Sequence, residues 1–322
     1  MASEKPEKKF IMRRENAKNV YLTHRDVKTI LALGGLDIEI NDLAIYQQAF
    51  LHRSYLKPND SYESAPGFIP LQASCNETYE FLGDSILNSI IGCYLYERYY
   101  AQNEGFLTKT RTKMVRSNTL GELGRCLNFD KFVILSQHVE HENGRTNVRI
   151  LEDLFEAFIA ALYLDNTCTD EQLLKDQAAE IKQLEREAGS TPWTLAQRQR
   201  YGQLKTGRNN GYTYCKRFVM TVYERYIDIV KLIAYDDNYK DQLQHYYQQT
   251  EGVFPTWHVM KEEGKTNNRW HTVGVKDRFG YTIGVGRERK KTDAEQMASK
   301  NALIHLGIVQ DEEVNYFKGK TT

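Results

Sequence analysis

The segment that most limits how this chain can fold runs from Ile150 to Asp165 and is apolar on nearly every side. A helix of that composition is stable only when other elements surround it, so the segment predicts a central, buried helix. Two acidic residues, Asp153 and Glu156, nevertheless lie one turn apart among Leu and Phe side chains. Because an unpaired carboxylate is costly to bury, we expect these two acids to have a positively charged partner.

Residues 76–87 form a second segment in which acidic and apolar residues alternate. Phe81 and Leu82 are large and apolar, as in a helix that packs in a core, and Gly83 indicates close approach of another backbone. An isolated spacing of acids like the one here more often marks a solvated helix face, but the apolar neighbours favour a buried helix. Three acids are spaced by three and four residues and therefore share one helix face: Glu77, Glu80 and Asp84.

Two acidic helices that are both expected to be buried indicate one shared site. Carboxylate oxygens are the ligands that suit Mg²⁺ or Mn²⁺, and the sequence has no Cys/His cluster that would favour a softer metal. We therefore predict a divalent metal site, with no small-molecule cofactor. Its expected ligands are four acids, two from each segment: Glu80, Asp84, Asp153 and Glu156.

Composition bounds the remaining possibilities. A length of 322 residues suggests two domains, and a formal net charge of zero means that any basic surface must be local. The five cysteines form no C-x-x-C pair, which favours reduced thiols in an intracellular protein. The chain starts without an apolar signal region and has no stretch of membrane-spanning length. We expect a soluble cytoplasmic or nuclear protein that is not secreted and has no membrane partner.

The other segments differ in character along the chain. Residues 1–19 are polar and basic and predict a mobile tail. Residues 56–74 contain three prolines and a glycine and predict a loop. Residues 104–120 alternate cations with apolar residues, which predicts an amphipathic helix with a cationic face. Residues 166–235 predict a further helical region, whose last helix, 218–233, has an apolar stripe.

The pattern changes after a short polar linker at residues 236–238. A helical segment that includes Leu243 is followed by three strand-like runs at 257–261, 270–276 and 281–286. Several cations then precede another predicted helix at 293–306. The order helix, three strands, helix predicts a small α+β domain. A general α+β interaction module is the alternative to a nucleic-acid-binding one.

Several of these segments resemble the ribonuclease III family of double-stranded-RNA endonucleases. The run N-E-T-Y-E-F-L-G-D-S-I-L at 76–87 resembles the family signature, and H-R-S-Y at 52–55 resembles its upstream segment. Residues 103–120 resemble the basic segment between the two acidic helices, and Asp153-x-x-Glu156 resembles the second acidic motif. Residues 238–310 resemble the double-stranded-RNA-binding domain that follows in the family.

This resemblance implies an all-α endonuclease domain over residues 20–235, with an extended helical region from about 166, followed by the α+β domain at 238–310. It implies a homodimer that cleaves double-stranded RNA with Mg²⁺, or with Mn²⁺ as a substitute. The products would have 5′-phosphate and 3′-hydroxyl ends with short 3′ overhangs, and the activity would serve RNA processing or decay. A non-cleaving double-stranded-RNA-binding protein on the same fold is the alternative.

The resemblance also implies residues that contact RNA. Three positions depart from the family pattern in the second domain, namely His245, Asn267 and Thr292, which bears on RNA affinity. The positive end of the last helix is expected to face phosphates. The implied substrate-binding residues are Glu77, Glu104, Lys109, Arg111, Arg116, Gln244, Gln248, Lys290 and Lys291.

Overall fold

The computed structural model forms two compact units. The first contains residues up to Ile229 together with the segment from Phe317, and the second extends from Val230 to Tyr316. The predicted boundary at residue 235 therefore lies within the second unit. The structure describes residues 14–59, 61–167, 171–188, 192–205, 210–264, 269–310 and 316–318.

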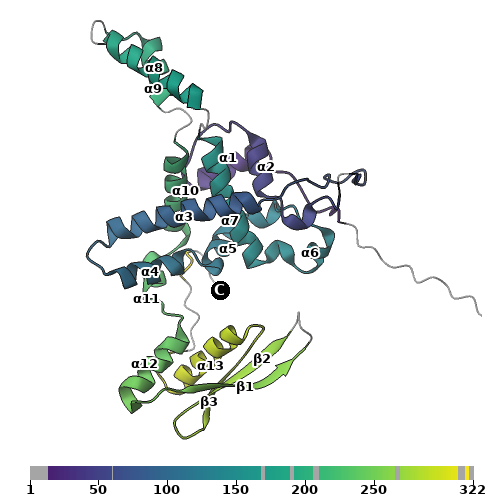
Figure 1. The fold of residues 1–322 in the computed structure, drawn as a ribbon, viewed down its shortest axis with the longest axis vertical. Coiled ribbons are helices and arrows are strands. Elements are labelled where there is room, and N and C mark those ends of the chain that lie inside the picture. The colour runs from purple at the N-terminus through teal and green to yellow at the C-terminus, as the bar shows by residue number, and fades with distance from the viewer. Residues whose placement is uncertain are drawn as a thin grey trace, which may run out of the picture. The chain divides into compact units, whose positions relative to one another are not determined.

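Helices make up the first unit (Figure 1), as predicted for the nuclease domain. Helix α7 lies at its centre and packs on α2, α3, α5 and α10, because Leu154, Phe155 and Phe158 along it are all fully buried. The predicted central helix is thereby confirmed. The helices of this unit are α1 His24–Leu33, α2 Leu43–Ala49, α3 Glu77–Arg98, α4 Glu104–Met114, α5 Ser117–Cys126, α6 Gln137–His141, α7 Val148–Asp165, α8 Glu171–Ala188, α9 Leu195–Lys205 and α10 Gly211–Tyr226. Short 3₁₀ turns lie at Arg53–Tyr55, Phe129–Lys131 and Gly144–Thr146.

A buried carboxylate fixes the end of α7 against the start of α2. Asp165 accepts hydrogen bonds from the backbone N–H groups of Asn41 at 3.1 Å and Asp42 at 2.8 Å, and from the Tyr46 hydroxyl at 3.1 Å. Burial and the Asp165 carboxylate both raise the pKa of Tyr46, so its hydroxyl stays protonated and continues to donate. Asp165 is therefore a structural acid that satisfies exposed donors at a helix start.

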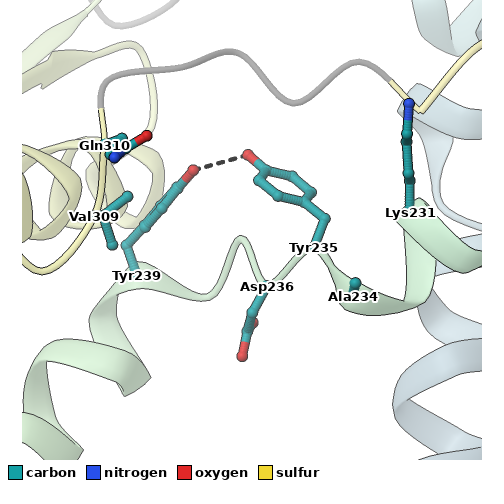
Figure 2. Close-up of a pocket in the computed structure, with 7 residues that line it drawn as sticks. All are labelled: Lys231, Ala234, Tyr235, Asp236, Tyr239, Val309 and Gln310. Atoms are coloured by element: carbon teal, nitrogen blue, oxygen red, sulfur yellow. Dashed lines mark hydrogen bonds between the residues drawn. The ribbon is translucent and has the colours of Figure 1, made fainter.

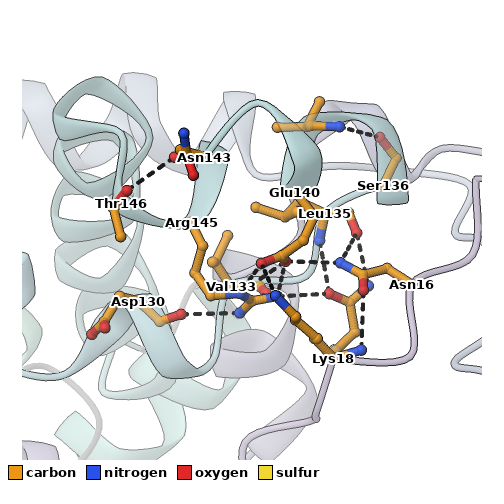
Figure 3. A network of polar contacts seen from close by, with 12 residues as sticks. Asn16, Lys18, Asp130, Val133, Leu135, Ser136, Glu140, Asn143, Arg145 and Thr146 are labelled. Carbon is orange, nitrogen blue, oxygen red and sulfur yellow. Dashed lines mark hydrogen bonds and ion pairs between the residues drawn. The ribbon is translucent and has the colours of Figure 1, made fainter.

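Residues 14–19 do not belong to a mobile tail, although the rest of that predicted tail lies outside the described residues. Asn16 and Asn19 are buried, and each donates to the carbonyl of Leu135. Figure 3 shows Asn16 beside Leu135 and Glu140. Glu140 accepts hydrogen bonds from Asn16 and Arg145. Burial alone would raise the pKa of Glu140, but these hydrogen bonds outweigh it and lower that pKa to about 2. Polar contacts that the sequence pattern does not show thus hold this segment in place.

Two further predictions for the first unit need correction. The segment 104–120 is not one amphipathic helix, because the chain breaks between Met114 and Ser117 into α4 and α5. The cations of this segment do not all lie on one solvent-exposed face, since Lys113 is buried. Phe81 is 78% exposed rather than packed in a core, because α3 buries only the face that contains Ile86, Leu87 and Ile90. The predicted loop at 56–74 has no helix or strand among its described residues.

The second unit has the predicted α-β-β-β-α order after a short helix, α11, Ile229–Ala234. Helix α12, Tyr239–Glu251, precedes an antiparallel sheet of β1 Thr256–Glu263, β2 Trp270–Lys276 and β3 Thr282–Glu288, with β2 in the middle. Helix α13, Lys291–His305, lies against one face of the sheet (Figure 1). A Cβ on Gly284 or Gly286 would overlap the backbone of α13, so these glycines permit the close packing.

Candidate active site

The two acidic helices meet where Gly83 of α3 contacts the backbone of α7. A Cβ on Gly83 would overlap the carbonyl oxygen of Glu156, so only glycine allows this approach. The neighbouring residue on α3 is Asp84, and the contact therefore brings acids that are 72 positions apart in the sequence to one place. Helix α5 approaches the other side of α7 in the same way, through Gly121 and Gly124.

Three carboxyl groups at this contact, those of Glu80, Asp153 and Glu156, have raised pKa values and hold protons more strongly than ordinary acids do. Burial, and then the charges of Asp84, Glu152, Glu80 and Asp153, raise the pKa of Glu156 to about 9. Glu156 is 7% exposed, so little water screens those charges.

Asp153 and Glu80 respond to the same surroundings. Burial, followed by the charges of Glu80 and Glu152, raises the pKa of Asp153 to about 7. Burial and the charges of Glu77, Glu152 and Asp84 raise the pKa of Glu80. Acids from α3 and α7 act on each other, and their repulsion would be relieved by a bound cation.

Two residues that act on the cluster were not predicted. Glu152 lies four residues before Glu156, so the helical spacing was a signal that could have found it. Arg53, which the sequence placed only within the H-R-S-Y segment, pairs with Glu77 at 3.4 Å, and its charge opposes the rise in the pKa of Glu80 and Asp153. The distance of 24 positions between Arg53 and Glu77 gave no sequence signal for that contact.

The acids do not converge on a single point in this structure. Within the described part of the chain, no three His, Cys, Asp or Glu side chains form a group arranged to hold a metal ion. Asp84 instead accepts a hydrogen bond from the Asn88 amide at 2.6 Å, and Glu77 faces Arg53. The donor set is nevertheless all carboxylate and partly buried, which fits a hard divalent cation.

The raised pKa values predict how pH affects the stability of the protein without divalent ions. The folded state binds more protons than the unfolded chain between the ordinary pKa of a glutamate, 4.5, and the folded pKa of Glu156, about 9. The free energy of unfolding should therefore be highest at the acid end of this range and fall as pH rises through it, by about 2 kcal/mol after allowance for relaxation.

Melting curves in EDTA at pH 5, 7 and 9 measure this effect, in parallel with curves in Mg²⁺. We expect Mg²⁺ to restore much of the stability at pH 9, because it binds only the folded state. The variant Glu156→Gln should be more stable than the wild type at pH 9 in EDTA, since it lacks the charge that the fold disfavours. Equal pH dependence in the two proteins would contradict the assignment of the effect to Glu156.

Apart from Glu77 on α3, the predicted RNA-contact residues of the first unit lie on α4 and at the start of α5. Glu104 is the first residue of α4 and accepts a hydrogen bond from the Thr108 hydroxyl at 2.8 Å. Lys109 and Arg111 are exposed on the same helix, and Arg116 is the N-cap residue of α5. The cation that acts on Glu80 is instead Arg53.

In the second unit, the predicted contact residues occupy two helices. Gln244 and Gln248 lie one turn apart on α12, on a different side of the helix from its buried residues Tyr239, Leu243 and Tyr247. Lys290 and Lys291 are exposed at the N-terminus of α13, where the partial positive charge of the helix adds to theirs. The departure at Asn267 lies outside the described residues.

A pocket of about 420 Å³ also lies in the second unit, near α11 and the end of α13 (Figure 2). The hydroxyl groups of Tyr235 and Tyr239 form a hydrogen bond of 2.8 Å beside it. Because its lining includes one carboxylate, Asp236, it does not offer the acid cluster found between α3 and α7. The lining residues are Lys231, Ala234, Tyr235, Asp236, Tyr239, Val309 and Gln310.

Comparison with known families agrees with both parts of the fold. The description "Ribonuclease-III-like" matches residues 42–175, and "Double-stranded RNA binding motif" matches residues 239–306. These two ranges contain the acid cluster and the α-β-β-β-α unit, respectively. They define the class of protein as a helical nuclease domain followed by an RNA-binding domain.

Individual relatives extend over most of the chain. Ribonuclease 3 of Enterococcus faecalis is 30% identical over 266 residues, which are 83% of this chain and 92% of that protein. Ribonuclease 3 of Shouchella clausii is 29% identical, over 91% of this chain and 92% of that protein. The probable ribonuclease 3 of Acanthamoeba polyphaga mimivirus is 28% identical over 88% of this chain, which spans only 46% of that longer protein. A crystal structure of the nuclease domain of Campylobacter jejuni ribonuclease III has 25% identity and a TM-score of 0.36, and covers 43% of this chain and 83% of that one.

The chain therefore belongs to the ribonuclease III family of endoribonucleases. Its C-terminal unit is a double-stranded-RNA-binding domain. Among the helices that the structure describes, none has the length and apolar character needed to cross a membrane.

Proposed function

We propose that this protein cleaves double-stranded RNA with Mg²⁺ and leaves 5′-phosphate and 3′-hydroxyl ends with short 3′ overhangs. The observation that supports it most is the group of partly buried acids at the contact of α3 and α7, whose raised pKa values favour a bound cation. The double-stranded-RNA-binding domain on the same chain supports duplex RNA as the substrate. The products would serve the processing or decay of duplex RNA.

Within the proposed site, Glu80, Asp84, Asp153 and Glu156 would hold the cation. A divalent cation held there supplies a Lewis acid that stabilises negative charge developing on the attacked phosphate. Glu156 is the most buried of these acids and the one whose pKa is raised most, so a bound cation relieves the largest penalty there. Mn²⁺ suits the same oxygen ligands and would substitute for Mg²⁺.

The remaining residues of the cluster have supporting roles in this proposal. Glu77 faces Arg53 at the start of α3, and it shapes the site or contacts RNA instead of binding the cation. Arg53 is 71% exposed on its side chain, so it can neutralise an RNA phosphate that approaches the acids. The exposed cations Lys109 and Arg111 of α4 provide further phosphate contacts.

In the second unit, the N-terminus of α13 and its lysines Lys290 and Lys291 would contact phosphates across the major groove. Gln244 and Gln248 of α12 would reach the minor groove, where duplex RNA displays its 2′-hydroxyl groups. These contacts recognise the shape of the duplex more than its sequence, which suits an enzyme that acts on varied duplexes.

Incubation of a long, end-labelled RNA duplex with Mg²⁺, Mn²⁺ or EDTA tests the proposed activity. We expect cleavage with either metal ion and none in EDTA, with single-stranded RNA of the same sequence remaining intact. Phosphatase and ligase treatment of the products identifies their ends. Binding of the duplex without cleavage under both metals would support the alternative of a non-cleaving RNA-binding protein.

We further propose that the nuclease unit forms a homodimer through the exposed face of α3. Phe81 is 78% exposed and Tyr96, on the same helix, is 68% exposed, which is unusual for large apolar side chains on a free surface. Phe81 also adjoins the acids, so a second copy seated there would place two clusters beside one duplex. Each cluster would then cut one strand.

Substitution of Phe81 by aspartate tests this interface. We expect the wild type to sediment as a dimer and Phe81→Asp to sediment as a monomer, because a charge buried in an apolar contact weakens association by roughly 100-fold or more. Analytical ultracentrifugation over a range of concentrations measures the shift. Phe81→Leu is the matched control and should remain dimeric. A monomeric wild type would contradict the proposed interface.

A further inference from the structure

Trp270, the first residue of β2, lies against two arginines at one end of the sheet. The guanidinium carbons of Arg287 and Arg289 are 5.2 and 5.7 Å from the centre of its indole ring. Both distances are within the range of a cation–π interaction, and tryptophan is the strongest aromatic partner for it. Thr272 pairs with Arg287 across β2 and β3. Trp270 and Arg289 each lie two residues from one member of that pair, so all four side chains are on the same face of the sheet.

The two arginines differ in how their charge is balanced. Arg287 forms an ion pair with Glu263 at 3.1 Å. Arg289 has no acidic partner among the residues that the structure describes, and the same is true of Lys290 and Lys291, which follow it directly. Three consecutive exposed cations thus lie at the N-terminus of α13, where the helix adds partial positive charge. Like charges repel, so such a group is costly unless an anion binds to it.

We infer that Arg289, held in place by the indole of Trp270, contacts a phosphate of duplex RNA beside Lys290 and Lys291. This inference rests on the proposed binding of duplex RNA. Arginine suits this role because its planar group presents several donors to a phosphate while one face stacks on an aromatic ring. Stacking also restricts a side chain that would otherwise lose conformational freedom on binding, so Trp270 acts as a positioning residue.

The arrangement also bears on Thr292, where the resemblance to the family leads one to expect a second basic residue of a pair. The Thr292 hydroxyl donates to Asp293 at 3.3 Å and brings no charge. Arg289 supplies a cation on the other side of Lys290 and Lys291. Arg289 thereby compensates for the charge that is missing at Thr292. Its side chain comes from just past the end of β3, before the first residue of α13.

The salt dependence of duplex binding tests the contact. Affinities of the full chain for an RNA duplex of about 20 base pairs are measured in EDTA at several salt concentrations, with no cleavage possible. Arg289→Gln should weaken binding roughly 3- to 10-fold and reduce the slope of log K against log salt by about one, as expected for one lost phosphate contact. Thermal melting of each variant verifies that it is folded.

Arg278→Gln is the matched control. Arg278 stacks on Phe279 at 4.5 Å in the turn between β2 and β3, at the other end of these strands, and pairs with Glu251 at 3.3 Å. The Arg278→Gln substitution removes the same charge from an arginine that is also stacked on an aromatic ring. We expect it to leave the slope of log K against log salt unchanged. Equal losses in both variants would show a general charge effect and overturn the inference.

A double-mutant cycle tests the role of Trp270. Trp270→Leu should weaken binding nearly as much as Arg289→Gln, and the double variant should lose little more, because both substitutions remove one contact. Trp270→Phe keeps a weaker stacking surface and should give intermediate affinity. Additive losses would overturn the positioning role. A wild type that binds no duplex would remove the proposed function as well, whereas an unchanged slope in Arg289→Gln overturns the inference alone.

Discussion

Glu156→Gln should abolish cleavage of double-stranded RNA while the protein still binds the duplex. The substitution keeps the shape of the side chain and removes the charge that a divalent cation would need. Loss of a ligand from the proposed metal site is expected to reduce the cleavage rate on the order of 10³-fold or more, which corresponds to about 4 kcal/mol of transition-state stabilisation. The fold should be retained, since glutamine has the shape of glutamate and lacks the charge that burial and the neighbouring acids disfavour at this position.

Three measurements separate this result from a general loss of function. Single-turnover cleavage gives the rate, and binding in EDTA should change less than about threefold, because the phosphate contacts lie elsewhere. Calorimetric titration with Mg²⁺ gives a readout that does not depend on activity, and it should show weakened binding of the ion. Glu97→Gln is the matched control, since this glutamate of α3 is 65% exposed and pairs with Lys216. Cleavage by Glu156→Gln at the wild-type rate would contradict the proposed role.

Gly83→Ala is expected to be strongly destabilising, because among the glycines that the structure describes Gly83 is the one where an added Cβ would come closest to another atom. The new Cβ would overlap the carbonyl oxygen and carbon of Glu156, and these are backbone atoms that cannot rotate away. Helix α3 must therefore move away from α7. Overpacking of this kind costs about 3 kcal/mol, or roughly 6–12 °C in melting temperature for a domain of this size.

The same displacement should impair catalysis in the molecules that remain folded. Asp84 follows Gly83 and would move away from Glu156, so we expect at least a 100-fold loss of cleavage at a temperature where the variant is folded. Gly92→Ala is the matched control on the same helix, because a Cβ there meets no atom within 4 Å. That variant should be unchanged or slightly more stable, since alanine favours a helix. A Gly83→Ala protein as stable as Gly92→Ala would contradict the tight contact.

Much of this fold could be predicted from local patterns. Helix α7 has apolar residues on nearly all of its sides, so it is stable only when it is buried. Its burial requires other helices to surround it. The order of the second unit followed from the change in hydrophobic period and from the cations before α13. Glu80, Asp84, Asp153 and Glu156 were predicted as ligands because their spacing puts charge where apolar residues predict a core.

Other features of the site depend on contacts between distant segments. Arg53 faces Glu77 through the turn at Arg53–Tyr55, and no periodicity links the two residues. Phe81 was expected in the core but is exposed. In the sequence, an apolar residue that packs inside its own chain has the same neighbours as one that packs against another molecule, so the pattern does not separate the two cases. Asn16 and Asn19 belong to a polar segment, and it is their hydrogen bonds to the distant carbonyl of Leu135 that hold them in place.

By itself, the sequence determined the kind of protein: a buried acidic helix, a second acidic helix and a basic α+β domain, each of which follows from residues close together in the chain. Only the tertiary structure decided how these parts act on one another. The approach of α3 to α7 at Gly83 sets the electrostatic field in which Glu156 holds its proton, and the pairing of β2 with β3 puts Arg289 against Trp270. Spacing along a chain fixes which side chains share a face, whereas their pKa values and contacts depend on the distances that folding creates between faces.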